Sequence, residues 1–204
     1  MKTWRMRALL AVAAVTLLVT QAASAQAAVV ETSPCDGATL SKPFVRWADV
    51  ADYKLAPGGD FEGGLAGWTL AGGAGTTAGS EPWNVTGAAG GRSLALPAGA
   101  AATTPATCVN AGAPTFRFFA RSTGGLLPIL KVDLVYRDTA LRLVPVPVGV
   151  VVGGSAWRPT LPMLTASVVA GALANGDAPL SLRFTALSGT WQLDDVYVDP
   201  YARG

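Results

Sequence analysis

The sequence predicts an all-β protein, an antiparallel sandwich or barrel. Short apolar runs, about eight to ten candidate strands, alternate with loops rich in glycine, proline and serine. No stretch after residue 27 shows a sustained 3.6-residue apolar period, and the alanine-rich runs 98–102 and 170–174 each contain a glycine that disfavours a helix. Several runs instead alternate apolar and polar residues with a period of two, which is typical of strands with one buried face.

Residues 1–27 have the features of a secretory signal peptide. Lys2, Arg5 and Arg7 precede a short apolar stretch over residues 8–20, and two Ala-x-Ala cleavage sites follow within residues 23–27. The apolar stretch is shorter than the roughly 20 residues of a membrane-spanning helix. We therefore expect a secreted, extracellular protein with no membrane insertion.

Residues 28–56 form a lead-in segment with little regular pattern, which we expect to lie along the sandwich. Cys35 in this segment and Cys108 are the two cysteines of the chain. In an exported protein they predict one disulfide that ties the lead-in down, stabilising the fold by about 4 kcal/mol in the chain-entropy model. Two free buried thiols are the alternative. Residues 57–204 then form a single β-sandwich domain.

Three runs define the strands of this domain most clearly. In Thr115–Arg121, Ile129–Arg137 and Pro179–Leu187, apolar residues alternate with polar ones, as in antiparallel sheets with one wet face. Weaker signals predict further strands at 67–70, 93–96, 106–109, 142–151, 164–169 and 190–198. Because Pro145 and Pro147 cannot donate to a ladder, we expect the strand at 142–151 to lie at a sheet edge or to bend there.

Composition argues against several classes of function. The chain has no histidine, so it cannot assemble a Ser-His-Asp or Cys-His catalytic group. Without the three basic residues of the signal peptide, 12 of the 15 basic residues and all 13 acidic ones remain, a net charge of −1. Nucleic-acid binding needs clustered positive charge, so we expect no such partner. A pair of carboxylates for glycoside hydrolysis stays open on composition alone, but we expect no enzyme.

Two segments carry a resemblance to a known family. Gly59-Asp60-Phe61-Glu62, followed by Trp68, and Trp191-Gln192-Leu193-Asp194-Asp195-Val196 resemble the opening and closing strands of secreted carbohydrate-binding modules of the family 4/9 and 22 type (galactose-binding-like). The resemblance implies a jelly-roll β-sandwich in which these two segments meet. It also implies a structural calcium held by Glu62 and Asp194, with Asp195 as the alternate ligand. Ordinary strand-end carboxylates capped by backbone N–H groups or arginine are the alternative.

Sugar binding on such folds uses exposed aromatic rings flanked by polar groups. Trp83 and Trp157 lie in loop-like sequence, whereas Trp68 and Trp191 belong to the predicted strands and are expected in the core. Phe119 shares the polar face of its strand with Arg117 and Arg121. We therefore predict a ligand-binding surface formed by Trp83, Trp157, Phe119, Arg117 and Arg121. The alternative for the two tryptophans is that they anchor loops over the sandwich edge.

Together these features predict a secreted, non-catalytic module that binds carbohydrate or another cell-surface polymer. The alternative is a structural or protein-interaction β-sandwich with no sugar affinity, because a fold does not fix a function.

Overall fold

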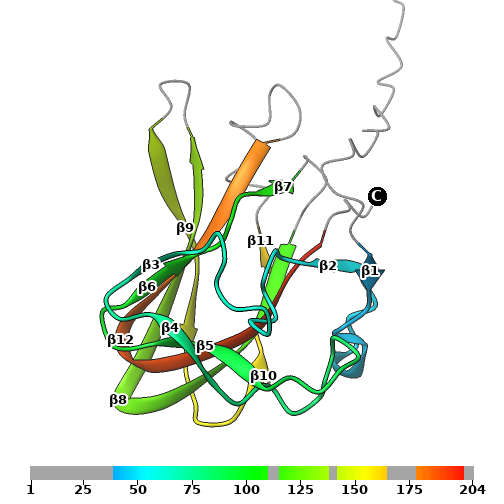
Figure 1. The fold of residues 1–204 in the computed structure, drawn as a ribbon, viewed down its shortest axis with the longest axis horizontal. Helices are drawn as coiled ribbons and strands as arrows, with labels where there is room; N and C mark the ends of the chain where they lie inside the picture. Colours follow the sequence, from blue (N-terminus) through cyan, green and yellow to red (C-terminus); the bar gives the residue numbers. More distant parts are fainter. Residues whose placement is uncertain (1–38, 110–114, 138–141, 165–177, 200–204) are drawn as a thin grey trace, which may run out of the picture.

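The computed structural model describes residues 39–109, 115–137, 142–164 and 178–199 (Figure 1). These ranges contain one short 3-10 helix, η1 (Val45–Trp47), and no α-helix, which confirms the all-β prediction. No helix in them is long and apolar enough to cross a membrane. The strands are β1 (Leu40–Ser41), β2 (Tyr53–Leu55), β3 (Thr69–Ala71), β4 (Gly75–Ala78), β5 (Arg92–Leu96), β6 (Ala101–Thr103), β7 (Thr107–Val109), β8 (Thr115–Arg137), β9 (Leu143–Val152), β10 (Arg158–Pro159), β11 (Met163–Leu164) and β12 (Ala178–Val198).

Two long antiparallel strands, β8 and β12, form the frame of the molecule. They pair from Val135 with Ser181 at one end to Phe116 with Val198 at the other, and they curve together through the lower part of the view (Figure 1). At the curve, Gly125 has φ +108°, and a Cβ there would lie 2.7 Å from the Cα of Gly189. Glycine is therefore required where the two backbones pass closest. The strands predicted at 115–121 and 129–137 are thus two halves of one bent strand.

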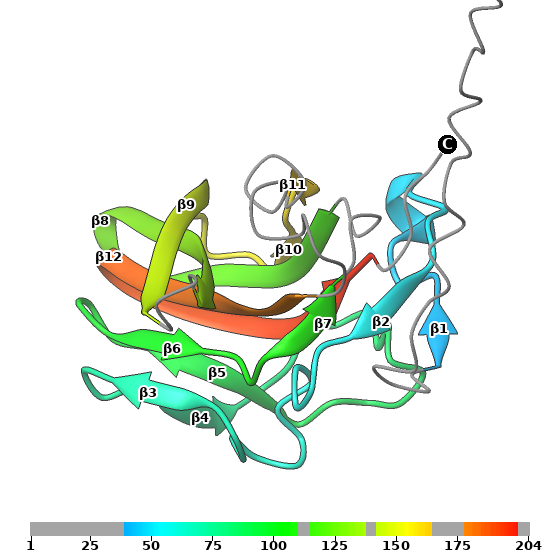
Figure 2. The ribbon, with the colours of Figure 1, turned by 90° about the horizontal axis from the view of Figure 1, so that it is seen from above.

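The bend gives the long ribbon two halves, each extended by shorter strands. The first half of β8, residues 115–122, pairs with β10 and β11 on one side and with the last part of β12 on the other. That part of β12 also pairs with β5 and β2, while β4 adds to β5. The second half, residues 129–137, carries β9, and the first part of β12 carries β6 and β7, with β3 beyond β6 (Figure 2). The result is an antiparallel jelly-roll β-sandwich, as predicted.

The core lies where the inward faces of the two halves meet. Phe118 from the first half and Phe184 from the second lie 5.0 Å apart in an edge-to-face contact. The alternate positions Leu130, Val132 and Leu134 are buried with them, as the period of two predicts. Trp68 and Trp191 also belong to this core, as expected from the sequence.

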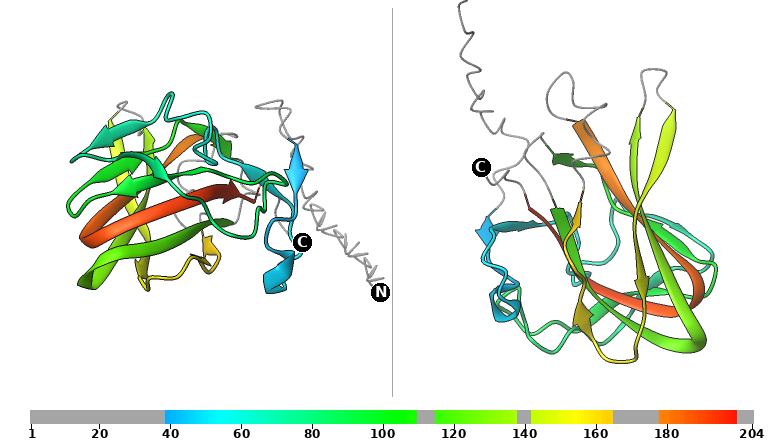
Figure 3. Two further views of the ribbon diagram at one scale, coloured as in Figure 1. Left: turned by 60° about the horizontal axis from the view of Figure 1, so that its bottom comes forward. Right: turned by 180° about the vertical axis from the view of Figure 1, so that it is seen from behind.

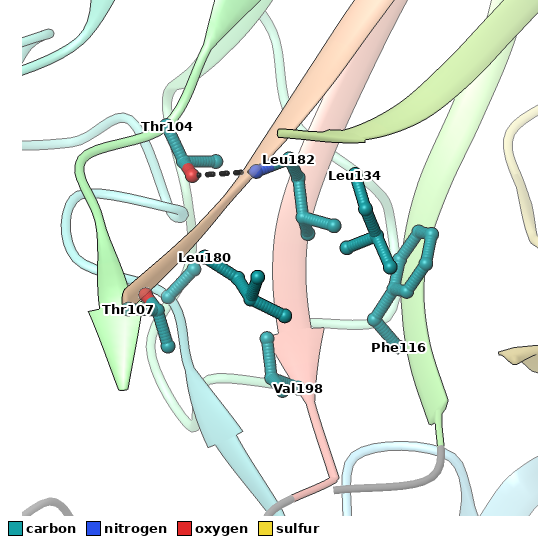
Figure 4. Close-up of a pocket in the computed structure, with 8 residues that line it drawn as sticks. Thr104, Thr107, Phe116, Leu134, Leu180, Leu182 and Val198 are labelled. Atoms are coloured by element: carbon teal, nitrogen blue, oxygen red, sulfur yellow. Dashed lines mark hydrogen bonds between the residues drawn. The ribbon is translucent and has the colours of Figure 1, made fainter. Parts of the chain in front are cut away.

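A small apolar cavity remains inside this core (Figure 4). Its volume is about 10 Å³, and its lining consists of Ala56, Thr104, Thr107, Phe116, Leu134, Leu180, Leu182 and Val198. The Thr104 hydroxyl accepts a hydrogen bond of 3.0 Å from the Leu182 backbone N–H. The buried Thr107 hydroxyl has no hydrogen-bond partner within the described part of the chain. Such a group destabilises the fold unless a water molecule reaches it.

Strand β9 confirms the expectation drawn from its prolines. Among the strands that the structure describes, it pairs only with β8, so it lies at an edge. The register shifts between Val132 and Asp133, opposite Gly149 and Pro147, so the strand is also irregular at that point. Exposed prolines on an edge strand hinder the addition of a further strand.

The described part of the lead-in, residues 39–56, lies along one side of the sandwich, away from β3, β6 and β9 (Figure 3). β2 pairs with the end of β12, and β1 pairs with β2. The predicted disulfide lies outside the described residues, because Cys35 precedes them. The domain boundary at 56/57 remains a prediction.

Candidate functional site

The five predicted binding residues converge on one face of the sandwich. Arg117, Phe119 and Arg121 alternate along the outward face of the first half of β8. The ring of Trp83 lies 5.5 Å from that of Phe119. The Arg121 guanidinium lies over the Trp157 ring, 5.0 Å from its centre. The structure therefore brings the five residues together, and their role in ligand binding remains a prediction.

That surface is covered by the lead-in. Phe44, immediately before η1, stacks on Phe119 with ring centres 5.6 Å apart, and Trp47 meets the same ring edge-to-face at 5.4 Å. Phe44 also packs against Tyr53 and Tyr197, at 5.0 and 5.8 Å. These rings form a second buried cluster on the outer face of the sandwich, which we call the lead-in cluster: Phe44, Ala51, Tyr53, Phe119, Trp157 and Tyr197.

An ion pair fixes the lead-in over this face. Arg117 Nη1 donates to Asp49 Oδ2 at 2.8 Å, Arg117 Nε donates to the Thr160 carbonyl oxygen, and the guanidinium lies 4.2 Å from the centre of the Phe44 ring. Burial opposes ionisation of Asp49, but hydrogen bonds from Tyr53, Ala51 and Arg117 outweigh it and lower the pKa of this carboxyl. Arg117 therefore anchors the lead-in and has little freedom to meet a ligand.

Exposure separates the five residues into two groups. Phe119 is fully buried, Trp157 is 9 % exposed and Arg117 is 5 % exposed, so none of them offers an open face in this structure. Trp83 and Arg121 are half-buried and lie at the rim of the lead-in cluster. The sequence did not reveal that Phe44 and Trp47 cover Phe119; the only signal was the density of aromatic residues between positions 44 and 53.

A groove opens beside Arg121, at the bend of the long ribbon. Its volume is about 510 Å³, and it is lined by Arg121, Ser122, Thr123, Gly124, Gly125, Leu126, Pro128, Gly153, Gly154 and Ser155. Arg121 Nε donates to Gln192 Oε1 at 2.7 Å, and Trp157 supports the guanidinium from one side. The guanidinium is therefore held in place at one end of the groove.

The two segments that carry the family resemblance meet at a seam. The Ala56 N–H donates to the Val196 carbonyl oxygen at 2.8 Å, and the Val196 N–H donates to the Gly59 carbonyl oxygen at 3.0 Å. Residues 57–60 and 62–63 form turns rather than the predicted first strand. A Cβ at Gly59 would lie 2.9 Å from the Val196 carbonyl oxygen, so glycine permits this approach.

Acidic side chains gather at the seam. Asp194 Oδ2 accepts hydrogen bonds from Ser80 Oγ at 2.6 Å and from the Glu81 N–H at 2.8 Å. Burial raises the pKa of Asp194 to about 6. Burial, reinforced by the charges of Asp194, Glu81 and Asp60, raises the pKa of Asp195 to about 8. Asp195 is therefore largely protonated at neutral pH and can donate to the buried Glu81 carboxylate.

The predicted calcium ligands are engaged in hydrogen bonds. Glu62 Oε1 accepts from the Gly91 and Arg92 N–H groups at 2.7 and 2.8 Å, and Asp194 Oδ1 accepts from the Asp195 N–H. Within the described residues, no three Asp, Glu, His or Cys side chains are placed to share a metal ion. This arrangement matches the alternative of carboxylates capped by backbone N–H groups, and calcium binding remains a prediction.

Comparison with known proteins identifies the fold. A family 22 carbohydrate-binding module of Paenibacillus barcinonensis xylanase 10C, described as a xylan-binding domain, superposes with a TM-score of 0.51 at 16 % identity, over 71 % of this chain and 93 % of that one. The chain has a β-sandwich like those of family 22 carbohydrate-binding modules. No protein-family model and no curated protein matches its sequence.

Two larger solved structures contain the same type of module. One is the family 22 and catalytic modules of Clostridium thermocellum xylanase 10B in complex with xylohexaose, with a TM-score of 0.52 and 16 % identity over 71 % of this chain. The other is the tandem family 22 modules of the Paenibacillus enzyme, with a TM-score of 0.53 and 18 % identity over 76 % of this chain. The match spans 28 % and 46 % of those two chains, respectively. At these identities the likeness concerns the fold alone.

Proposed function

We propose that this chain is an exported, non-catalytic module that binds a polysaccharide in the groove beside Arg121. The observation that supports this most is the fixed guanidinium at the end of an open groove of about 510 Å³, a size suited to a few sugar rings. The likeness to xylan-binding modules supports a β-linked polysaccharide, with xylan as the first ligand to test.

The lining of the groove suits hydroxyl-rich ligands. Arg121 supplies donors, and Ser155 and Thr123 in the lining are exposed residues with hydroxyl groups. Trp83 is half-buried and contacts Phe119, two residues before Arg121 on the same strand. None of the residues that line the groove is a carboxylate, so the groove itself does not supply the acidic pair of a glycoside hydrolase.

The test is binding of the full chain without residues 1–27 to a panel of insoluble and soluble polysaccharides. Binding to xylan or another neutral polymer that is weakened about tenfold by Arg121→Gln supports the proposal. We expect an effect of this size because a hydrogen bond from a charged group contributes about 1.5–3 kcal/mol. Arg92→Gln is the control, since Arg92 is an exposed strand residue outside the groove and loses the same charge.

A structural or protein-interaction role is the second candidate, and one observation favours it. Leu126 is fully exposed at the bend, and Leu127 and Leu187 beside it are more than half exposed. Apolar side chains grouped at one corner are more typical of a protein contact than of a sugar site. No binding to any polysaccharide of the panel would favour this second role.

A further inference from the structure

A charged cluster lies on the other half of the sandwich, on the outward face of its sheet. Asp133 on β8 accepts from Lys131 Nζ at 3.1 Å and from Arg183 Nη2 and Nε at 3.1 and 3.3 Å. All three contacts fall on one oxygen, Oδ2. Lys131 and Asp133 follow the bend of β8, whereas Arg121 precedes it, and the cluster shares no residue with the groove.

The three members differ sharply in exposure. Asp133 is completely buried, whereas the side chains of Lys131 and Arg183 are 29 % and 35 % exposed. Asp133 Oδ1 is buried and has no hydrogen-bond partner among the residues that the structure describes. The carboxylate thus lies beneath the two cations and holds them together, while the cations form the surface.

The cluster carries an excess of positive charge at one point. Two cationic groups share a single carboxylate, and because both contact the same oxygen they are close enough to reach one further anion. The Arg183 Nη1 makes none of these contacts, which leaves N–H groups on the open side of the guanidinium. Lysine and arginine N–H groups form strong, charge-assisted hydrogen bonds with carboxylates.

Hydroxyl groups flank the two cations on the same face. Thr103 pairs with Arg183 in the register, and Thr185 pairs with Lys131. Both threonines are half-buried, and Thr69, beyond Thr103, is exposed. None of these outward positions is aromatic, so this face offers ionic contacts and hydroxyl hydrogen bonds rather than ring stacking.

We propose that Lys131 and Arg183 form a binding site for the carboxylate of a uronic acid residue, so that the module binds acidic polysaccharides. The threonine hydroxyls lie where they can meet hydroxyls of the same sugar ring. The inference extends the proposed function, since it treats the ligand as a polysaccharide, but it uses a different surface and different residues.

Polygalacturonic acid and its fully methyl-esterified form test the proposal. The two polymers share a backbone and differ in charge, so we expect binding to the acid form and at least tenfold weaker binding to the ester. Lys131→Gln and Arg183→Gln should each weaken binding to the acid form about tenfold, whereas Arg92→Gln should leave it within twofold. Equal binding to both polymers, or an equal effect of all three substitutions, would overturn the proposal.

Two further measurements separate loss of this site from misfolding and from loss of binding in the groove. Asp133→Asn removes the carboxylate that competes with the ligand, so binding to polygalacturonic acid should strengthen; weaker binding by a variant with an unchanged unfolding midpoint would contradict the site. If Arg183→Gln does not fold, Lys131→Gln carries the test, because Lys131 makes one contact with Asp133 whereas Arg183 makes two. Loss of neutral xylan binding in Arg121→Gln, but not in Arg183→Gln, distinguishes the groove from this site.

Discussion

The most informative single substitution is Phe44→Ala, because Phe44 joins the lead-in to the outer face of the sandwich. Its side chain is fully buried, stacks on Phe119, and contacts Tyr53 and Tyr197. Replacement of a buried phenylalanine by alanine typically costs about 3–5 kcal/mol. The Arg117 guanidinium would also lose the ring beneath it, which is worth about 1 kcal/mol at a partly desolvated site.

We therefore expect Phe44→Ala to lower the free energy of unfolding by about 3–5 kcal/mol, if the lead-in unfolds together with the sandwich. For a chain of this size, that corresponds to a fall of about 6–20 °C in the unfolding midpoint. Thermal unfolding followed by circular dichroism measures it. Val45→Ala is the matched control, since Val45 is the next residue and is half exposed; its midpoint should change little.

Acrylamide quenching of tryptophan fluorescence gives an independent readout at low temperature. Trp47 and Trp83 contact each other edge-to-face at 5.0 Å, and both lie against Phe119. If Phe44→Ala loosens only the lead-in, quenching should increase while the midpoint of the sandwich changes less. A variant with an unchanged midpoint and unchanged quenching would refute the view that Phe44 holds the lead-in on this face.

Four other predictions follow from the same structure. The pKa values of Asp194 and Asp195 are raised, so at these two groups the folded state binds more protons than the unfolded state. Their contribution to stability should be fully present below about pH 4 and be lost as the pH rises through about 8. Asp195→Asn should flatten this decline in urea titrations, and a profile as steep as that of the unmodified protein would contradict it. Gly125→Ala should cost about 2 kcal/mol or more because of its φ of +108° and its approach to Gly189, whereas Gly154→Ala, with no atom within 4 Å, should be nearly neutral. Thr107→Val should leave stability unchanged or raise it by about 1 kcal/mol, since it removes an unpaired hydroxyl from an apolar cavity; a clear loss would mean that a bound water pairs with it. If calcium binds at the seam, millimolar calcium should raise the unfolding midpoint above that in a chelator, and equal midpoints would exclude it.

The period-two pattern predicted the strands well because successive side chains of a strand point to opposite faces of the sheet, so a strand with one buried face alternates apolar and polar residues. Leu130, Val132 and Leu134 face the core, and the intervening Lys131 and Asp133 face outward, as their pattern indicates. The bend was not predicted, because Gly124 and Gly125 look like a loop in sequence and act as a close backbone crossing only once Gly189 lies opposite. Local pattern cannot show which distant glycine a segment will meet.

The surface around Phe119 likewise depends on contacts between distant segments, which local sequence patterns do not reveal. The sequence placed Phe119, Arg117 and Arg121 on one face and separately gave Trp83 and Trp157 as ligand-binding candidates in loops; the structure brings all five together. It could not show that Phe44 and Trp47 would cover Phe119, because this depends on how the lead-in docks rather than on any local pattern. At the seam, Glu81 completes the acidic group around Asp194, although nothing near it in the sequence distinguishes it from a surface residue.

The most direct test of polysaccharide binding is calorimetric titration of the chain without residues 1–27 with xylo-oligosaccharides and with the neutral polymers of the panel. We expect saturable binding to at least one neutral ligand, which Arg121→Gln weakens about tenfold and Arg92→Gln does not. Absence of heat with every ligand, or equal affinities for the two variants, would contradict it.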